Sequence, residues 1–445
     1  MREVAIVGGG ILGMTLALRL QGQGCRVTIL EAAPETGGLT VSQRIAGHTW
    51  DRFYHVILLS DLHLRGLLEE LGLGQKLRWG TTRTGFYCDG TLYSLSDSLE
   101  FLRFPPLSLI DKLRLAATIL YASRLRDWKP LERIPVVDWL RRLSGPRTTE
   151  RIWLPLLRSK LGENYRRASA AFIWAIIARM YAARRSGLKR EQFGYVEGGY
   201  RTVLETFRAR LESAGVRTLT GRPVTRVTDE GDRVTLQCGG AEPLRFDSAV
   251  LTVPCGQAAA MCPGLTEAER ARLGSVVYQG IVCASLLIRR PLAGYYITNI
   301  TDDRAPFTAV IEMTALVDPA TFGGHTLVYL PRYLTQGDAF WALSDTEVRD
   351  RFLEGLTRMH PDLRPADVLA FQVARVREML AVSTLNYSEA VMPPLRTSLQ
   401  NVFIVNSAQI PNGTLNVNET IGLAETSAMT LGTLLRLPTA VGAAR

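Results

Sequence analysis

The chain opens on a short apolar run followed by closely spaced glycines. Residues 4–7 are four small apolar residues in succession, which is typical of a strand buried on both faces of a parallel sheet. Leucines and alanines at residues 11–20 indicate a helix that glycines end, and residues 26–31 indicate a second strand closing on an acid. The opening therefore predicts a βαβ unit.

The middle of the chain is mostly helical in pattern. Residues 86–93 predict a hairpin with an Asp-Gly turn. Residues 105–190 then predict helices punctuated by prolines, and one helical stripe contains Phe172, Ile176 and Met180. We interpret this stripe as core rather than as a ligand site.

The remaining elements mix strands and helices without internal repeats. The predicted helices are 62–71, 202–214, 347–359 and 420–435, and the predicted strands are 216–219, 224–228, 234–238, 248–253, 282–288, 308–312, 326–329 and 401–406.

The glycines after the first strand have a chemical interpretation. Gly8, Gly10 and Gly13 have the G-x-G-x-x-G spacing, in which one glycine makes a tight turn, one lets a pyrophosphate approach and one lets the helix pack closely. Backbone N–H groups at the helix N-terminus then bind the phosphates. Glu31 ends the second strand and can accept hydrogen bonds from a ribose diol. These features predict a dinucleotide-binding site.

Basic residues are concentrated in one segment. The chain carries a net charge of +10, and the stretch from Arg141 to Arg190 holds 13 Lys and Arg residues against two acids. Nearly all are arginine, which binds phosphate and carboxylate through paired hydrogen bonds. The segment suits an anionic substrate or an anionic membrane surface, and a solvated helical face remains the alternative. No nucleic-acid-binding motif accompanies it, so we expect no nucleic-acid partner.

The six cysteines show neither a C-x-x-C motif nor metal-ligand spacing. We therefore expect buried free thiols, no metal site and a cytoplasmic protein. The first strand leaves no room for a signal peptide, and no apolar run approaches the roughly 20 residues that a membrane span requires. The sequence does not indicate an oligomeric state.

Taken together, these motifs resemble the superfamily of flavin-dependent amine oxidases, protoporphyrinogen oxidases and UDP-galactopyranose mutases. The resemblance spans nearly the whole chain and rests on residues 4–13, Glu31, the glycine pair 37–38, the segment 195–199, Val224 and the last helix. It implies an α/β fold with FAD as cofactor. A Rossmann-like FAD-binding domain of the glutathione-reductase-like, amine-oxidase type would be joined to a discontinuous α+β substrate domain.

The resemblance also implies the boundaries of these domains. The FAD-binding domain would comprise residues 1–80, 194–263 and 397–445. The substrate domain would comprise residues 81–193 and 264–396 and contain the arginine-rich helical insertion.

The same resemblance implies the cofactor contacts. The diphosphate would lie on the first glycine turn, Glu31 would bind the adenosine ribose, and Val224 would meet the adenine. His55 would lie beside the isoalloxazine, unless it is simply a satisfied histidine in an aromatic cluster. The expected contacts are Gly8, Gly10, Ile11, Leu12, Gly13, Glu31, Ala32, Gly38, Leu39, Thr40, Tyr54, His55, Val56, Val224, Ser407, Glu419, Thr420 and Ile421.

The last helix is expected to begin at the flavin. Its positive N-terminal end would stabilise the negative charge that a reduced flavin carries near N1 and O2. We expect Asn418 to cap this helix.

Three positions depart from the family pattern. Leu39 stands where many relatives have an arginine, and Asn406-Ser407 replaces a Gly-Asp pair. The chain also has no lysine after Lys189, whereas amine oxidases commonly keep a lysine near flavin N5. Simple amine oxidation is therefore disfavoured.

The resemblance favours an FAD-dependent oxidoreductase that dehydrogenates a small organic substrate by hydride transfer to flavin. The arginines favour a substrate that is anionic or sugar-linked. His55, Tyr329 or Arg375 would position the substrate. Two alternatives stay open: a redox-neutral mutase acting on a nucleotide sugar, and a non-enzymic flavoprotein that docks a partner or a membrane.

Overall fold

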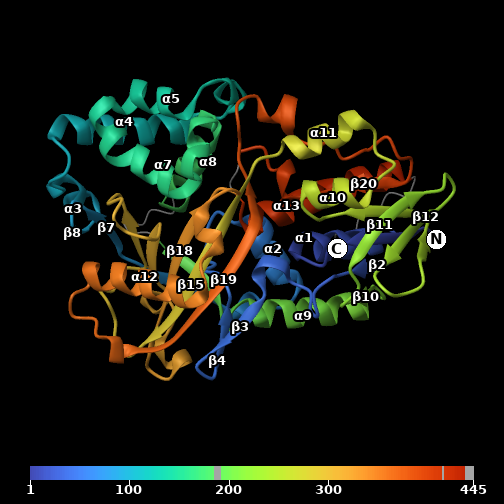
Figure 1. Ribbon diagram of the computed structural model, residues 1–445, viewed down its shortest axis with the longest axis horizontal. Coiled ribbons are helices and arrows are strands. Elements are labelled where there is room, and N and C mark those ends of the chain that lie inside the picture. Colours follow the sequence, from blue (N-terminus) through green and yellow to red (C-terminus); the bar gives the residue numbers. More distant parts are fainter. Residues whose placement is uncertain (185–191, 413–414, 436–445) are drawn as a thin grey trace.

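A five-stranded parallel sheet forms the centre of one half of the molecule (Figure 1). The computed structural model describes residues 1–184, 192–412 and 415–435. The first strand lies in the middle of this sheet, paired with the second strand on one side, as the apolar run predicted. In spatial order the strands are β10 (Arg217–Leu219), β2 (Arg26–Leu30), β1 (Glu3–Val7), β14 (Ser248–Leu251) and β20 (Val402–Ile404).

Alternate residues of these strands face two different layers. Val4 and Ile6 point into a core made with four helices, whereas Ala5 and Val7 point into a core on the other face of the sheet. The first layer consists of α1 (Ile11–Gly22), α2 (Leu62–Glu70), α9 (Gly199–Ser213) and α13 (Val417–Leu434). The second consists of α10 (Cys255–Met261), α11 (Glu267–Ser275) and the antiparallel strands β11 (Val224–Asp229), β12 (Val234–Cys238) and β13 (Leu244–Phe246).

A seven-stranded mixed sheet forms the centre of the other half. Helix α12 (Asp345–Met359) covers one face of it, and the opposite face packs against the chain around residues 39–58. In spatial order its strands are β19 (Val368–Ala381), β15 (Tyr278–Ile288), β18 (Thr326–Leu334), β17 (Ala309–Glu312), β16 (Ile297–Ile300), β7 (Thr84–Cys88) and β8 (Thr91–Ser94).

The predicted hairpin is confirmed as β7 and β8. Asp89 and Gly90 have φ values of 52° and 75°, which a two-residue turn with left-handed central residues requires. Smaller elements complete the strand inventory: β3 (Ser42–Ile45) pairs with β4 (His48–Asp51), and β9 (Gln192–Val196) pairs with β5 (Ile57–Leu58) and β6 (Leu77–Thr81).

The arginine-rich stretch belongs to a helical layer at the upper left of Figure 1. Phe172, Ile173 and Ile177 are buried in its core, which confirms the core interpretation of that stripe, while Ile176 and Met180 are half-buried. Residues 185–190 of the stretch lie outside the described residues. The helices are α3 (Ser98–Arg103), α4 (Leu109–Arg124), α5 (Val136–Ser144), α6 (Pro146–Thr148), α7 (Leu154–Leu161) and α8 (Ala170–Arg184).

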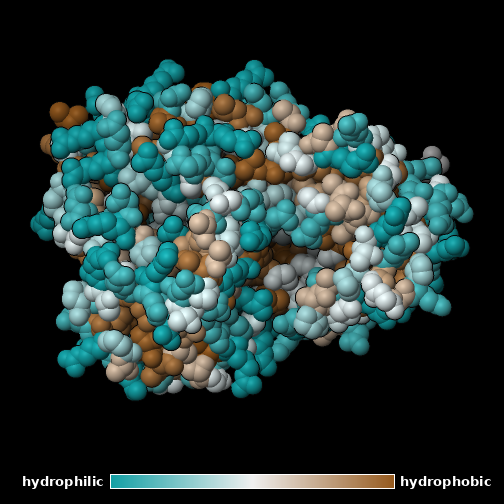
Figure 2. All heavy atoms as spheres, viewed as in Figure 1, coloured by the Kyte–Doolittle hydropathy of each residue, from teal (hydrophilic) through white to brown (hydrophobic). Residues whose placement is uncertain are grey.

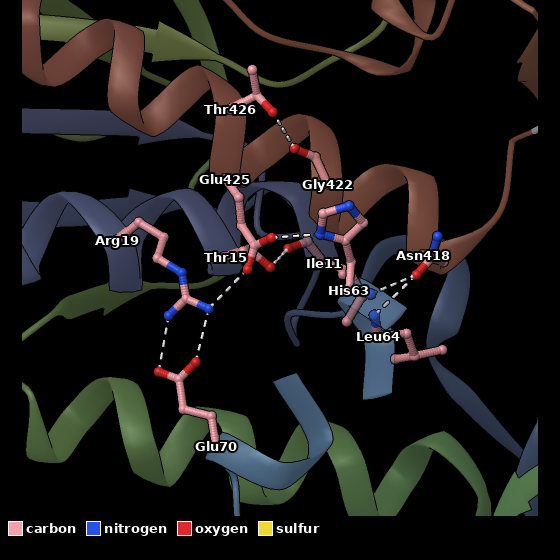
Figure 3. A network of polar contacts seen from close by, with 10 residues as sticks. All are labelled: Ile11, Thr15, Arg19, His63, Leu64, Glu70, Asn418, Gly422, Glu425 and Thr426. Atoms are coloured by element: carbon pink, nitrogen blue, oxygen red, sulfur yellow. Dashed lines mark hydrogen bonds and ion pairs between the residues drawn. The ribbon is translucent and has the colours of Figure 1, made fainter. Parts of the chain in front are cut away.

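Helices α1, α2 and α13 are joined by polar contacts (Figure 3). Arg19 of α1 bridges Glu70 of α2 and Glu425 of α13 at 2.8 and 3.1 Å. Asn418 does not cap its own helix as expected, because Asn416 does so by accepting from the Glu419 N–H. The Asn418 amide oxygen instead accepts from the first-turn N–H groups of α2, and this contact fixes where α13 begins.

A buried carboxylate holds β4 to α9. The Asp51 side chain is buried and accepts a 2.8 Å hydrogen bond from the Tyr200 N–H in the first turn of α9. No cation is paired with this carboxylate among the described residues, and burial raises its pKa from 3.8 to about 7.

We expect Asn418→Ala to lower the free energy of unfolding by about 1–2 kcal/mol, because two N–H groups of α2 lose their acceptor. Denaturant titration measures this loss. Thr430→Ala on the exposed side of the same helix is the control, since its hydroxyl bonds only within α13. Equal effects of the two variants would contradict the capping role.

Asp51 should make stability depend on pH. Between about pH 4 and pH 7 the folded protein keeps this proton and the unfolded chain releases it, so the free energy of unfolding falls as pH rises through that window. The Asp51→Asn variant does not carry this titration. We therefore expect its free energy of unfolding, relative to that of the wild type, to rise by at most about 4 kcal/mol from pH 4 to pH 8. Denaturant titrations across this range, with Asp232→Asn at an exposed position as control, check it; a difference that does not vary with pH would refute it.

Candidate functional site

The first glycine turn forms a cradle without side chains. A Cβ on Gly13 would lie 2.0 Å from the Gly8 carbonyl oxygen, so α1 can approach β1 this closely only with glycine there. Gly8 has a φ of 110°, and Gly10 is the N-cap of α1 with no side-chain cap and no acid in the first turn. The first-turn N–H groups, from Ile11 onward, therefore meet no competing side-chain acceptor and suit a diphosphate.

Glu31 lies at the carboxyl end of β2, as predicted. Its carboxylate accepts hydrogen bonds from the Gly9 N–H at 2.6 Å and the Ala33 N–H at 2.8 Å. Each carboxylate oxygen has a second acceptor site, so the group can still bind a ribose diol. Ala32 follows it directly in the same turn.

The second glycine pair meets the first turn. Gly37 donates to the Gly9 carbonyl at 2.8 Å, and a Cβ on Gly38 would lie 3.1 Å from the Cα of Gly10. The structure thus brings together residues separated by nearly 30 positions in the chain. Thr36 lies at the same turn, and its hydroxyl is buried without a partner in the described structure, which is consistent with a polar ligand at this edge.

Two further expected cofactor contacts, Thr40 and Leu39, already make interactions within the protein. The Thr40 hydroxyl donates to the Gly37 carbonyl at 2.8 Å. Leu39, the position where relatives have an arginine, packs half-buried against the aromatic core of the seven-stranded sheet. That position therefore serves packing, and its side chain offers a diphosphate no charge.

The segment 51–56 runs from the parallel-sheet half to the aromatic face of the seven-stranded sheet. Tyr329 is fully buried on that face, and its hydroxyl donates to the Asp51 carbonyl at 2.5 Å. Val56 packs in the same core. The segment 51–56 is therefore held by a hydrogen bond to its backbone at Asp51 and by packing of its side chain at Val56.

His55, one of the predicted contacts, lies against Tyr200 in the first turn of α9. Its ring is 4.9 Å from the Tyr200 ring, and its Nδ1 atom is buried with no hydrogen-bond partner in the described part of the chain. Burial lowers the pKa of His55 to about 4, so the imidazole is neutral at pH 7. A neutral ring with an unpartnered nitrogen can position a ligand through hydrogen bonding but contributes no positive charge.

Two side chains that the sequence did not single out, Tyr333 and Lys160, form a cluster with Tyr54, the neighbour of His55 in the chain. The Tyr54 and Tyr333 hydroxyls are 2.7 Å apart, and the Lys160 Nζ atom is 3.7 Å from the centre of the Tyr333 ring. Tyr54 was expected as a cofactor contact, but Tyr333 and Lys160 were missed. Tyr333 lies on the same strand face as Tyr329, four residues on, and that period-two spacing is the signal that could have identified it.

Arg375 is not brought to this site. It pairs with Val282 in the register of β19 and β15, and Val282 faces α12 on the other side of the sheet. Its guanidinium contacts Asp345 and the Leu343 carbonyl, so the side chain is engaged away from His55. The buried Tyr329 hydroxyl is also engaged, because it donates to the Asp51 carbonyl and so holds the segment 51–56 against the sheet.

The remaining expected contacts lie at the edges of the parallel sheet. Val224 begins β11, and Ser407 opens a short 3-10 helix after β20. Asn406 caps that short helix and also donates to the Val253 carbonyl, so this departure from the family pattern has a structural role. Glu419 and Thr420 lie in the first turn of α13 and Ile421 follows them, and the Glu419 N–H already donates to the capping Asn416 side chain.

Within residues 1–184, 192–412 and 415–435, no cluster of three or more histidine, cysteine, aspartate or glutamate residues is arranged to hold a metal ion. The six cysteines are all buried and free, which confirms the prediction of buried free thiols. No described helix is long and apolar enough to cross a membrane.

Figure 2 shows the surface hollowed near the centre of the molecule, between the two halves that the segment 51–56 connects.

Comparison with known proteins agrees with this geometry. Residues 13–414 match the family described as flavin containing amine oxidoreductase. A coproporphyrinogen III oxidase from Mycobacterium tuberculosis is 24% identical over 339 residues, which cover 71% of this chain and 73% of that protein.

Two solved structures show the same fold. Cyclohexylamine oxidase from Brevibacterium oxydans superimposes with a TM-score of 0.72 at 18% identity, covering 98% of this chain and 99% of that one. Reduced UDP-galactopyranose mutase superimposes with a TM-score of 0.74 at 15% identity, covering 97% and 96%. The glycine cradle, the acid after β2 and the match over most of the chain place this protein in the flavin-containing amine oxidoreductase family, as an FAD-dependent oxidoreductase.

Proposed function

We propose that the protein dehydrogenates a large, mostly apolar organic molecule that carries an anionic group, and that this substrate binds against Tyr54, Tyr333 and Lys160. The observation that carries the proposal is the hydrogen-bonded tyrosine pair with a lysine ammonium over one ring, beside the segment expected at the flavin. Aromatic faces suit an extended ring system, and the lysine suits a carboxylate.

The chain's own groups fit FAD. The first-turn N–H groups of α1 would hold the diphosphate, the Glu31 carboxylate would accept from the ribose, and Val224 would contact the adenine. Leu39, Val56 and His55 would lie along the flavin. When bound, FAD supplies the hydride acceptor, and the protein supplies orientation and electrostatics.

The side chains beside the flavin work by position rather than by proton transfer at neutral pH. Burial raises the pKa of Tyr54 well above its ordinary value, so its hydroxyl keeps its proton and can donate to a substrate oxygen or nitrogen. His55 is neutral and can accept or donate one hydrogen bond. Tyr329 keeps the segment in place, and Arg375 has no part in this proposal.

The comparison with coproporphyrinogen III oxidases suggests a substrate to test first. As that name states, those relatives oxidise a coproporphyrinogen, and a porphyrinogen carrying carboxylates has the size and charge that Lys160 and the tyrosines suit. We also propose a cytoplasmic setting, for which the free cysteines are the support.

Anaerobic mixing tests the function. We expect coproporphyrinogen III to bleach the flavin absorbance of the oxidised protein, whereas cyclohexylamine should leave it unchanged. Bleaching by the amine alone would overturn the substrate class. Activity on a UDP-sugar that requires a pre-reduced flavin would instead support the mutase alternative.

We expect Glu31→Ala to weaken FAD binding by about 1.5–3 kcal/mol, or about 10- to 100-fold in dissociation constant, because a charged acceptor is lost. Fluorescence titration of the apoprotein with FAD measures it. Glu35→Ala, which removes an exposed carboxylate on the same turn, is the control. Unchanged affinity in Glu31→Ala would remove this residue from the ribose.

Lys160→Gln should raise KM about 10-fold or more for a carboxylate-bearing substrate while leaving the flavin spectrum unchanged, because one charged hydrogen bond is worth about 1.5–3 kcal/mol. Lys129→Gln removes an exposed lysine of the same helical layer and serves as the control. An effect on kcat alone, or equal effects of the two variants, would count against substrate binding at Lys160.

A further inference from the structure

Three glycines in succession, Gly8, Gly9 and Gly10, form the turn between β1 and α1. Glycine has more backbone freedom than any other residue, so this run does not by itself select one conformation. The first-turn N–H groups of α1 can hold a diphosphate only when the turn in front of them keeps a single conformation. Contacts from outside the turn must therefore fix it.

The peptide group between Gly8 and Gly9 is held at both of its ends by side chains. The Glu31 carboxylate accepts from the Gly9 N–H at 2.6 Å. The Thr252 hydroxyl donates to the Gly8 carbonyl at 3.0 Å and lies 2.9 Å from the Val7 carbonyl oxygen. Among the described residues, Thr252 is the only hydrogen-bond donor to the Gly8 carbonyl. Two side chains from distant parts of the chain thus set the direction of this peptide group.

The position of Thr252 also explains why residue 8 is glycine. Gly8 has a φ of 110°, and a Cβ on it would lie 2.4 Å from the Thr252 Oγ1 atom. On another side of the same peptide, a Cβ on Gly13 would lie 2.0 Å from the Gly8 carbonyl oxygen. Helix α1 and the Thr252 side chain therefore both pack on the Gly8 carbonyl group, which leaves it little space to turn.

The turn that carries Thr252 is fixed by both neighbouring strands. Thr252 directly follows β14, and its N–H donates to the Val7 carbonyl at 2.9 Å. Asn406, which follows β20, is 1% exposed, and its Nδ2 atom donates to the Val253 carbonyl at 2.9 Å. These contacts hold Thr252 against the glycine turn, and they give Asn406 a place in the same arrangement.

We propose that Thr252 is a positioning residue for the cofactor. Its hydroxyl holds the Gly8–Gly9 peptide in the orientation in which the first-turn N–H groups of α1 can bind the diphosphate of FAD. Glu31 then has two tasks, because its carboxylate orients the same peptide and also accepts from the ribose. This role concerns cofactor binding and does not depend on which substrate the protein oxidises.

Titration of the apoprotein with FAD, followed by flavin fluorescence, tests this role. Thr252→Val removes the hydroxyl and keeps the branched shape, so we expect the dissociation constant for FAD to rise about 3- to 10-fold, the effect of one hydrogen bond. Thr252→Ala should give a similar rise, and it replaces the valine variant if the added methyl group beside Gly8 prevents folding. Thr252→Ser keeps the hydroxyl and should restore the wild-type affinity.

Thr357→Val is the matched control. The Thr357 hydroxyl also donates to two backbone carbonyls, those of Leu353 and Glu354, but it lies on α12 in the other half of the molecule. This variant should bind FAD as the wild type does. Unchanged FAD affinity in Thr252→Val and Thr252→Ala, an equal loss in Thr357→Val, or no recovery in Thr252→Ser would each overturn the proposal.

Denaturant titration of the apoproteins separates cofactor positioning from a purely structural role. Thr252→Val and Thr357→Val each lose one comparable hydrogen bond, so we expect similar small shifts in their unfolding midpoints. Similar midpoints together with a loss of FAD affinity in Thr252→Val alone would support the proposal. A much larger midpoint shift in Thr252→Val than in Thr357→Val would mean that the hydroxyl serves the fold, and would count against it.

Discussion

The close approach of three backbone segments at the first glycine turn is the constraint on which the rest of the structure depends. Gly13 brings α1 against β1, and the missing Cβ of Gly38 lets the Gly37–Gly38 turn approach Gly10. A side chain at Gly13 would meet the Gly8 carbonyl and push α1 away from β1, and one at Gly38 would crowd the Gly10 backbone. The same contacts leave the first-turn N–H groups of α1 without side-chain acceptors. The close packing of α1 on β1 therefore also creates a site for an anion.

The segment 51–56 connects the parallel sheet to the seven-stranded sheet, and hydrogen bonds to both halves hold it in place. The Asp51 carboxylate is held by α9, and the Asp51 carbonyl is held by Tyr329 of the seven-stranded sheet. Tyr54 then meets Tyr333 of the same strand. A buried carboxylate without a paired cation is costly, and its retention here is consistent with a need to fix the segment that contains His55 and Tyr54.

The parts of the fold that sequence predicted are those in which local pattern and tertiary environment agree. The βαβ opening, the Asp89-Gly90 hairpin and the core stripe of α8 have strong local signals. Strand β18 runs past Pro331, where a proline normally argues against a strand, and β19 is rich in helix-forming residues, so neither extent was visible. Tyr333 therefore lies beyond the predicted end of its strand, and the sequence did not indicate that Arg375 lies on the face of β19 that packs against α12.

Helix α4 shows why burial cannot be inferred from periodicity alone. Its sequence has a regular apolar stripe, and a stripe of that kind normally faces the core. Here the partners of its polar residues decide the orientation: Ser108, Leu102 and Ser144 satisfy groups that no apolar contact could replace. The exposed leucines are thus a consequence of a hydrogen-bonding arrangement on the opposite face. Burying these leucines by rotating α4 would leave the polar groups of its inner face without partners, so the hydrogen bonds outweigh the apolar pattern.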